Sequence, residues 1–360
     1  MNRKPGHPFL QSTAMTLNWL AAGLMLLAYL AQKQAPSQHT AIAVFGLIYP
    51  VLLFVHLFFI LFWALLKNSR WILSLLVVLM GFPQLKNNLA FHMRSASHHP
   101  KATKILSYNV QGFAKKNGAP YKAEIKGEIL SFLLKQNADI LCLQEYSGSK
   151  SDLLSKNSGG NSYFHSYYTQ KGSKNTGLVI ATKYRIVHSS YLKYKGYRTF
   201  GIYSDILIGK DTLRVINVHL ASISLGQDDL DLLSSAPSPA WQKQHVKSHF
   251  LDIYHKLQKA FRLRERQLNR VMQTVQSSRR PVVLCGDFND TPSSWAYYRT
   301  ARVLNDAFVE KGWGLSPTYA GPLPFLRIDY LFAGKALTIL SYNKYNFSGS
   351  DHFPISMEIE

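Results

Sequence analysis

The first hundred residues contain no aspartate or glutamate, although the chain of 360 residues has 20 acidic side chains. Residues 41–66 lack lysine and arginine as well, so 26 consecutive residues carry no formal charge. About 20 apolar residues are enough to cross the hydrocarbon core of a bilayer. This lack of charge excludes an ordinary soluble domain for this part of the chain and predicts a membrane segment.

Cysteine is nearly absent too, because the chain has only Cys142 and Cys285. Two distant cysteines form neither a zinc motif nor the disulfide framework of a small secreted domain. Each lies in an apolar run, where cysteine behaves as a small buried hydrophobe. The sequence also lacks an internal repeat and a glycine-rich nucleotide loop. The redox compartment stays open.

Lysine and arginine are abundant, with 41 basic against 20 acidic residues and a formal net charge of +21. Seven basic residues lie in the first hundred, so the remainder carries 34 basic and 20 acidic side chains, a net of +14. A basic domain favours a polyanionic partner, either nucleic acid or an anionic membrane surface. Part of the charge could serve solubility alone.

Three apolar stretches occupy residues 16–31, 41–66 and 71–82. The first, which follows Arg3 and Lys4, also suits a signal peptide, but the second span directly behind it favours an anchor. The third would reach only about 18 Å of a hydrocarbon core about 30 Å thick. It crosses if it draws in residues as far as Leu89, and otherwise lies in the interface. We expect two to three transmembrane helices, with the lipid bilayer contacting residues 16–89.

Beyond residue 100, apolar runs repeatedly end in side chains suited to metal binding or proton transfer. The clearest run, residues 281–284, leads to Asp287 and Asn289, which project to the same side if the strand period of two continues. A carboxylate and an amide side by side suit a hard divalent cation or the phosphate it holds. Aspartate and asparagine are also ordinary turn formers, so a plain turn is the alternative.

The same arrangement recurs at five other places. The side chains concerned are Asn109, Glu145, Asn217 with His219, Asp329, and Asp351 with His352. Each has a plainer interpretation, such as a helix cap, a core histidine, or for Asp329 an ion pair with Arg327. Six such strand ends in one domain are much harder to explain in that way.

In order and spacing these motifs resemble the endonuclease/exonuclease/phosphatase superfamily, which includes DNase I-like nucleases, apurinic endonucleases, inositol-polyphosphate phosphatases and neutral sphingomyelinases. The resemblance covers roughly residues 101–360, with no departure at the six motifs. It implies an α/β fold, a four-layer α/β/β/α sandwich of two packed mixed β-sheets with outer helices, preceded here by the N-terminal transmembrane segment. We therefore expect a membrane anchor over residues 1–100 and a catalytic domain over 101–360.

The resemblance further implies a divalent-metal-dependent phosphoester hydrolase. Glu145 would be the direct metal ligand, with Asn109 beside it and Asp351 completing the metal neighbourhood. Because all these ligands are oxygens, Mg²⁺ fits best and Mn²⁺ is a plausible substitute.

Catalytic roles are likewise carried over from the family. Asp287 would orient or deprotonate the attacking water, and His352 would act as an acid/base or phosphate-stabilising group, with Asp329 fixing its tautomer. His219 would protonate the leaving group. Two asparagines, Asn217 and Asn289, would bind substrate phosphate.

The side of the membrane depends on the third apolar stretch. Basic residues before the first span and after the second, at Lys67 and Arg70, favour a cytoplasmic side for both positions. The catalytic domain is then outside if residues 71–89 cross and cytoplasmic if they do not. Three-helix anchors ahead of such a domain resemble bacterial membrane members of the family. We therefore expect a multi-pass protein of a bacterial inner membrane with a periplasmic catalytic domain.

The substrate stays open. A phosphodiesterase of the endonuclease type would use the basic domain and the aromatic stretch 163–168 with Lys171 to hold nucleic acid. A sphingomyelinase-like or phosphoinositide-type lipid phosphoesterase would explain the membrane tether. A non-catalytic membrane scaffold is the third alternative, against which the intact motifs argue. The sequence indicates no protein partner.

Helical spacing predicts amphipathic helices over residues 123–135 and 248–276. The basic residues of the second helix, including Arg264, are interpreted as a solvated face. Thr291 with Pro292 predicts a helix start. The polar loops 147–162 and 223–240 are predicted to form the rims of the site.

Overall fold

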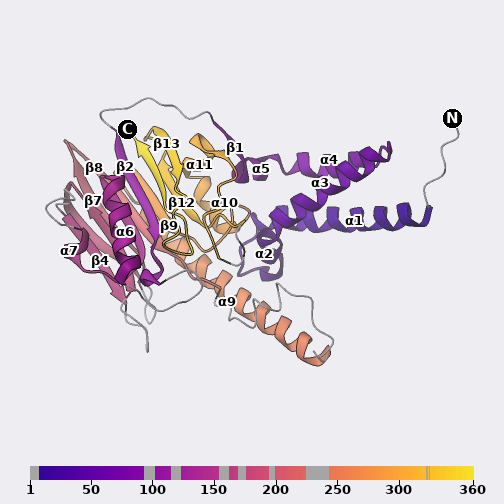
Figure 1. Ribbon diagram of the computed structural model, residues 1–360, viewed down its shortest axis with the longest axis horizontal. Coiled ribbons are helices and arrows are strands. Elements are labelled where there is room, and N and C mark those ends of the chain that lie inside the picture. Colours follow the sequence, from indigo (N-terminus) through magenta and orange to yellow (C-terminus); the bar gives the residue numbers. More distant parts are fainter. Residues whose placement is uncertain are drawn as a thin grey trace.

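Two six-stranded sheets packed face to face form the centre of the computed structural model (Figure 1). The structure describes residues 8–92, 102–114, 123–153, 162–168, 176–193, 199–223, 243–321, 323 and 325–360. The first sheet consists, in spatial order, of β13 (Ile339–Lys344), β14 (Ile355–Ile359), β2 (Thr103–Asn109), β3 (Ile140–Tyr146), β5 (Thr176–Thr182) and β4 (Ser162–Tyr168). The second consists of β10 (Leu304–Asp306), β12 (Asp329–Gly334), β9 (Val282–Asp287), β8 (Asp211–His219), β7 (Thr199–Ile208) and β6 (Arg185–Lys193).

Each sheet has one parallel pair among its described strands, β2 with β3 and β8 with β9. In these pairs Asn109 lies opposite Gln144, and His219 lies opposite Asp287. The carboxyl ends of parallel strands lie at the same edge of a sheet. The two pairs therefore bring four of the motifs to one end of the sandwich.

Apolar side chains fill the space between the sheets and cover both outer faces. Ile105, Ile180, Val215 and Val283 are fully buried in the inner layer, which also contains Cys142 and Cys285. Helix α6 (Ala123–Gln136) covers the first sheet and α9 (Lys243–Gln276) covers the second. The predicted four-layer sandwich is confirmed. The shorter helices are η1 (Gln111–Phe113), α7 (Lys150–Leu153), α10 (Trp295–Ala301) and α11 (Ala307–Lys311).

The two predicted amphipathic helices correspond to α6 and α9, but the helix start predicted at Thr291 is wrong. Helix α10 begins at Trp295, and its cap is Ser294, whose hydroxyl accepts a hydrogen bond from the N–H of Tyr297 at 3.1 Å. Thr291 and Pro292 instead lie buried in the preceding loop. Serine is as good a helix cap as threonine, so local preference alone does not choose between them.

The N-terminal part consists of α1 (Pro8–Ala31), α2 (Thr40–Leu47), α3 (Tyr49–Leu65), α4 (Trp71–Met80) and α5 (Phe82–Asn88). In Figure 1, α1, α3 and α4 extend side by side away from the sandwich, whereas α2 and α5 lie next to it. A two-stranded sheet of β1 (Ala90–Phe91) and β11 (Trp313–Gly314) joins the two parts.

By length and composition, α1 is long and apolar enough to cross a membrane over Phe9–Ala31. A second crossing exists if α2 and α3, which meet at an angle of 59°, count as one span. The apolar stretch predicted as a span over residues 41–66 thus consists of two helices that meet at a bend. The break precedes Pro50, which lacks an N–H and is tolerated in the first turn of a new helix.

The bundle of α1, α3 and α4 encloses a small polar cluster within a largely apolar interior. Asn18, His56 and Ser74 are fully buried, and the Ser74 hydroxyl lies 3.0 Å from Nδ1 of His56 and donates to Oδ1 of Asn18 at 2.7 Å. Large apolar residues are exposed around the bundle, among them Leu17, Trp19, Leu20, Phe54, Phe58, Leu61, Leu76 and Leu79.

Asn217 links the two sheets. Its side-chain amide donates hydrogen bonds to the carbonyl oxygens of Leu143 at 2.9 Å and Val179 at 2.8 Å, and its Oδ1 accepts one from Gln144 at 2.7 Å. Asn217 is 0% exposed, and both amide protons are used inside the sandwich. The predicted role of Asn217 in binding substrate phosphate does not fit this position.

We expect Asn217→Ala to lower the free energy of unfolding by about 1–3 kcal/mol, because buried carbonyl groups lose their partner. Chemical denaturation of the full chain in detergent measures this change. Asn269→Ala, at an exposed position of α9, is the matched control and should stay within about 0.5 kcal/mol of the parent. Equal stability of the two variants would contradict the structural role of Asn217.

Candidate active site

The carboxylate of Asp287 lies at the centre of the site and is 1% exposed. Its Oδ2 accepts a hydrogen bond of 3.0 Å from Nδ2 of Asn109. The Nε2 atoms of His219 and His352 lie 3.6 Å and 3.7 Å from the same carboxylate oxygen. Oδ1 accepts a hydrogen bond of 2.8 Å from the backbone N–H of Asn289. One buried carboxylate therefore contacts groups from both sheets and from the closing segment of the chain.

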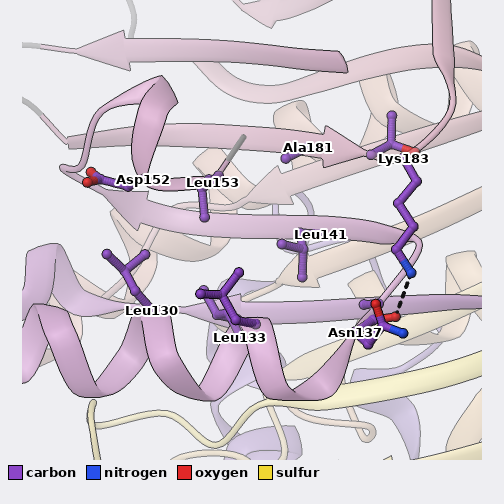
Figure 2. Close-up of a pocket in the computed structure, with 11 residues that line it drawn as sticks. Leu130, Leu133, Asn137, Leu141, Asp152, Leu153, Ala181 and Lys183 are labelled. Atoms are coloured by element: carbon purple, nitrogen blue, oxygen red, sulfur yellow. Dashed lines mark hydrogen bonds between the residues drawn. The ribbon is translucent and has the colours of Figure 1, made fainter. Parts of the chain in front are cut away.

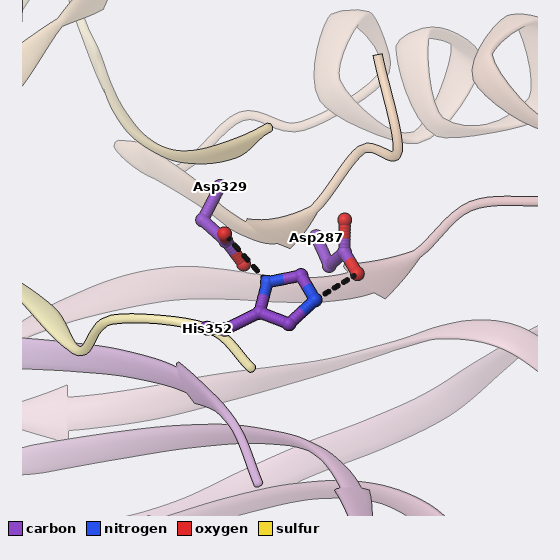
Figure 3. A group of neighbouring side chains, drawn as sticks. All are labelled: Asp287, Asp329 and His352. Carbon is purple, nitrogen blue, oxygen red and sulfur yellow. Dashed lines mark hydrogen bonds and ion pairs between the residues drawn. The ribbon is translucent and has the colours of Figure 1, made fainter. Parts of the chain in front are cut away.

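His352 lies between two carboxylates, as Figure 3 shows. Its Nδ1 is hydrogen-bonded to Oδ2 of Asp329 at 2.8 Å, and its Nε2 faces Asp287. Burial lowers the pKa of His352, but the charges of Asp329, Asp287 and Asp351 outweigh burial and raise this pKa to about 10. The imidazole is therefore a cation at neutral pH, with its Nδ1–H donated to Asp329.

Arg327 does not pair with Asp329, which was the plainer interpretation of that aspartate. The Arg327 guanidinium lies 2.8 Å from Oδ2 of Asp306 and stacks over the rings of Phe308 and Tyr330. The structure thus assigns Arg327 to Asp306 and leaves Asp329 facing His352.

Glu145 lies at the end of β3 with φ at +52°, in the left-handed region. The register between β3 and β5 shifts between Leu143 and Tyr146, which places Glu145 in a bulge. Such a backbone conformation costs roughly 1–3 kcal/mol and is typical of functional sites. Oε1 of Glu145 lies 3.6 Å from Nε2 of His219 and 3.3 Å from Nδ2 of Asn109. The Glu145 side chain is 32% exposed, so this carboxylate lies at the mouth of the site.

Asn109 turns its amide NH₂ group toward Glu145 and Asp287, while its Oδ1 accepts a hydrogen bond of 3.0 Å from the N–H of Gln111. In this orientation Asn109 offers protons to the two carboxylates. Ligation of a metal through its oxygen requires the amide to turn, so the predicted metal contact of Asn109 stays a prediction.

The donor set fits a divalent cation. One ligand atom each from Asp287, Asp329 and His352 lie within 4.8 Å of one another, close enough to share an ion. Asp351 adds a fourth group, with Oδ1 4.0 Å from Nε2 of His352, and burial raises the pKa of its carboxyl. Several carboxylates around one small volume suit a hard cation with oxygen ligands.

Gly286 allows the strand carrying Asp287 to approach its neighbour. Its φ is +126°, and a Cβ atom there would lie 2.0 Å from the carbonyl oxygen of Val218. Strand β9 then ends at Asp287, and Asn289 adopts a φ of +52°. The predicted strand alternation therefore does not extend to Asn289, whose Nδ2 donates to the carbonyl of Leu220 at 2.9 Å.

Arg264 is a site-supporting residue that the sequence interpretation missed. It is 1% exposed rather than solvated, and its Nε lies 3.1 Å from Oδ2 of Asp290. Its Nη1 donates to the carbonyl of Asn289 at 2.7 Å. A signal was available, because Arg264 comes three residues after Phe261 and four before Leu268, the spacing of one helix face. Both of these neighbours are buried.

Other predicted parts of the site lie elsewhere. The aromatic stretch 163–168 lies in the edge strand β4, whereas Lys171 and most of loops 147–162 and 223–240 fall outside the described residues. A separate hollow lies between α6 and the first sheet (Figure 2). Its lining includes Leu130, Leu133, Leu141, Leu153, Asp152 and Lys183, and none of the nine predicted site residues. Its charged groups are paired, Asp152 with Lys126 and Lys183 with Asp139, so it does not suit a phosphate.

Known structures share this architecture at low identity. An endonuclease/exonuclease/phosphatase from Bacteroides vulgatus is 15% identical with a TM-score of 0.51, covering 72% of this chain and 98% of that one. A protein of the same description from Beutenbergia cavernae is 17% identical with a TM-score of 0.49, covering 72% of this chain and 72% of that one. The human Nocturnin catalytic domain with bound sulfate is 17% identical with a TM-score of 0.48, covering 73% of this chain and 94% of that one. The similarity to the Bacteroides vulgatus structure supports the fold alone, and the other two similarities, with TM-scores below 0.5, carry no argument.

Comparison with family models is more decisive. No curated protein matches the chain. A model for a domain of unknown function matches residues 11–88. The model for the endonuclease/exonuclease/phosphatase family matches residues 106–352, which is more than half of the chain and contains all nine predicted site residues. The chain therefore belongs to the endonuclease/exonuclease/phosphatase family of phosphoester hydrolases.

Proposed function

We propose that the chain is a membrane-tethered, divalent-metal-dependent phosphodiesterase of the endonuclease type. The observation that carries this proposal is the buried carboxylate of Asp287 between His219 and His352, beside the more exposed Glu145. Hydrolysis of a phosphodiester needs a group that activates water, a group that protonates the leaving oxygen, and positive charge around the phosphate. The two histidines and the acidic groups supply separate candidates for each task.

Glu145, Asp351 and Asn109 are proposed to hold Mg²⁺, with Mn²⁺ as a substitute, because their ligand atoms are oxygens. When bound, the cation polarises the phosphoryl oxygens and offsets the charge that develops on the leaving oxygen. The position of Glu145 at the mouth of the site supports this assignment.

Asp287 is proposed to orient or deprotonate the attacking water. His352, cationic and oriented by Asp329, would bind a phosphate oxygen or transfer a proton. His219 would protonate the leaving oxygen, since its Nε2 faces both Glu145 and Asp287 and its side chain is 16% exposed. Asn289 would hold a phosphate oxygen, because one proton of its amide bonds to Leu220 and a second is left over.

The membrane tether is supported by the surface of the N-terminal bundle. Exposed apolar side chains around a small buried polar cluster are an arrangement that suits lipid, because polar groups then face neighbouring helices. The turn between α3 and α4, which contains Lys67 and Arg70, lies at the end far from the sandwich (Figure 1). Positive residues favour the cytoplasmic side. We therefore propose three crossings in a bacterial inner membrane, with a periplasmic catalytic domain.

The substrate is proposed to be nucleic acid, because the remainder of the chain beyond residue 100 carries a net charge of +14. A phospholipid headgroup is the second candidate. One observation favours it: the loop that follows Asn289 touches α2, so the site lies close to the proposed membrane surface.

Chelation should abolish phosphodiester hydrolysis by the full chain, and Mg²⁺ or Mn²⁺ should restore it. Glu145→Gln should require a higher Mg²⁺ concentration for half-maximal rate, because one anionic ligand becomes neutral. Glu310→Gln, at an exposed position on α11, is the matched control and should behave like the parent. Full turnover in excess chelator would contradict the metal assignment.

His352→Ala and His219→Ala should each reduce kcat by about 10²–10⁴-fold, the effect typical of a lost acid/base group. Asp329→Asn should be nearly as damaging as His352→Ala, and the double variant should cost little more, since residues acting as one unit are not additive. The exposed His188→Ala is the control. A folded His352→Ala variant with normal kcat would refute the mechanism.

Salt separates the two substrate classes. Binding of an oligonucleotide to the full chain in detergent should weaken steeply as NaCl rises, because each phosphate contact releases counterions. Fluorescence anisotropy over a salt series measures the slope. A flat slope together with release of a phospholipid headgroup would establish the lipid alternative.

A further inference from the structure

The N-terminal helices contact loop 290–293, the segment directly behind the proposed catalytic Asp287. The Nε2 group of Gln32, which is 7% exposed, donates to the carbonyl of Pro292 at 2.9 Å. The hydroxyl of Thr291, 1% exposed, donates to the carbonyl of Gly46 in α2 at 3.2 Å. Both contacts join residues more than two hundred positions apart in the sequence.

Gly46 shows how closely α2 approaches this loop. A Cβ atom added there would lie 2.7 Å from the carbonyl oxygen of Ser293, closer than real Cβ contacts come, and 3.2 Å from Cβ of Ala31. The obstructing atom belongs to the backbone, so it cannot move aside like the end of a flexible side chain. The close contact between α2 and loop 290–293 therefore requires glycine at position 46.

The opposite side of the loop is held by α9. Arg264 pairs with Asp290 at 3.1 Å and donates to the carbonyl of Asn289 at 2.7 Å. The backbone N–H of the same residue, Asn289, donates to Oδ1 of Asp287 at 2.8 Å. A short chain of contacts thus leads from α2, through loop 290–293, to the carboxylate at the centre of the site.

Helix α2 is itself seated on α9. Its residues Ala43, Val44 and Leu47 pack against Ile253, Leu257 and Phe261. The segment before α2 is tied down as well, because Ser37 donates to the carboxylate of Glu265 through its N–H at 2.6 Å and its hydroxyl at 2.7 Å. Loop 290–293 therefore lies between α2 and α9, and these two helices pack against each other.

We propose that Gly46 and Gln32 are positioning residues of the active site, and that the N-terminal helices complete the site as well as tether it. This inference rests on the proposed catalytic role of Asp287. Contact with α2 holds loop 290–293 in the place that lets Asn289 fix the Asp287 carboxylate. Metal binding at Glu145, which lies on the other sheet, is independent of this contact.

Gly46→Ala tests the inference, with Gly23→Ala as the matched control, because a Cβ at Gly23 meets nothing within 4 Å. Alanine forms helix better than glycine, so neither change weakens its own helix. In the full chain, Gly46→Ala should lower kcat by about 10²-fold, the effect of a misplacement of about 1 Å. KM and the Mg²⁺ concentration for half-maximal rate should stay unchanged. Gly23→Ala should leave all three at the parent values.

Amide hydrogen exchange tests the same contact without activity. Peptides that cover residues 288–294 should exchange faster in Gly46→Ala than in the parent and in Gly23→Ala, whereas peptides from β3 should not change. If no variant, the parent included, hydrolyses phosphodiesters, the proposed function fails. The exchange result still decides whether α2 holds the loop.

Gln32→Ala is the milder second variant and removes one hydrogen bond to the loop, with the exposed Gln38→Ala as its control. It should lower kcat and speed exchange of residues 288–294 in the same direction as Gly46→Ala, by smaller factors. The inference is overturned if Gly46→Ala and Gln32→Ala match their controls in both kcat and exchange. A fall in kcat accompanied by an equal rise in KM or in the Mg²⁺ requirement would also overturn it.

Discussion

The buried charge of Asp287 is the constraint on which the site depends. A carboxylate that is 1% exposed must be compensated, because an unpaired buried charge is very costly. Its partners come from three places: Asn109 at the end of β2, His219 at the end of β8, and His352 in the last loop, besides the backbone N–H of Asn289. Compensating one charge therefore holds together the open ends of both sheets and the closing segment of the chain.

Backbone geometry sets the second requirement. Glu145 and Asn289 both have φ at +52°, and Gly286 lies where a side chain would collide with β8. Asparagine tolerates this region through its short polar side chain, whereas glutamate gains nothing from it. The positive φ of Glu145 coincides with the register shift between β3 and β5, where the regular ladder is interrupted. The positions of the proposed catalytic side chains therefore depend on the backbone geometry at the strand ends as well as on residue type.

The sequence predicted what depends on local pattern. Apolar runs ending in polar residues indicated the strand ends, and the resemblance of the ordered motifs to a known family implied the two-sheet fold. Local pattern could not show which polar groups face inward. Asn217 lies on the same face of β8 as His219, but two residues further from the strand end, where its amide bonds to the carbonyls of Leu143 and Val179 inside the sandwich. The helical spacing of Arg264 did indicate the buried face of α9, but the Asp290 that compensates its charge could not be identified from local pattern. What α2 packs against could not be predicted either, because α9 is distant along the chain.

The polar cluster of Asn18, Ser74 and His56 also has a consequence for biosynthesis. These three groups come from α1, α4 and α3, and in an apolar surrounding they find partners only when the helices adopt one mutual arrangement. All five N-terminal helices leave the ribosome before Asp287 is made, and domains generally fold in order of synthesis. The surface that receives loop 290–293 can therefore be assembled first and act as an internal template for the enzyme that follows it.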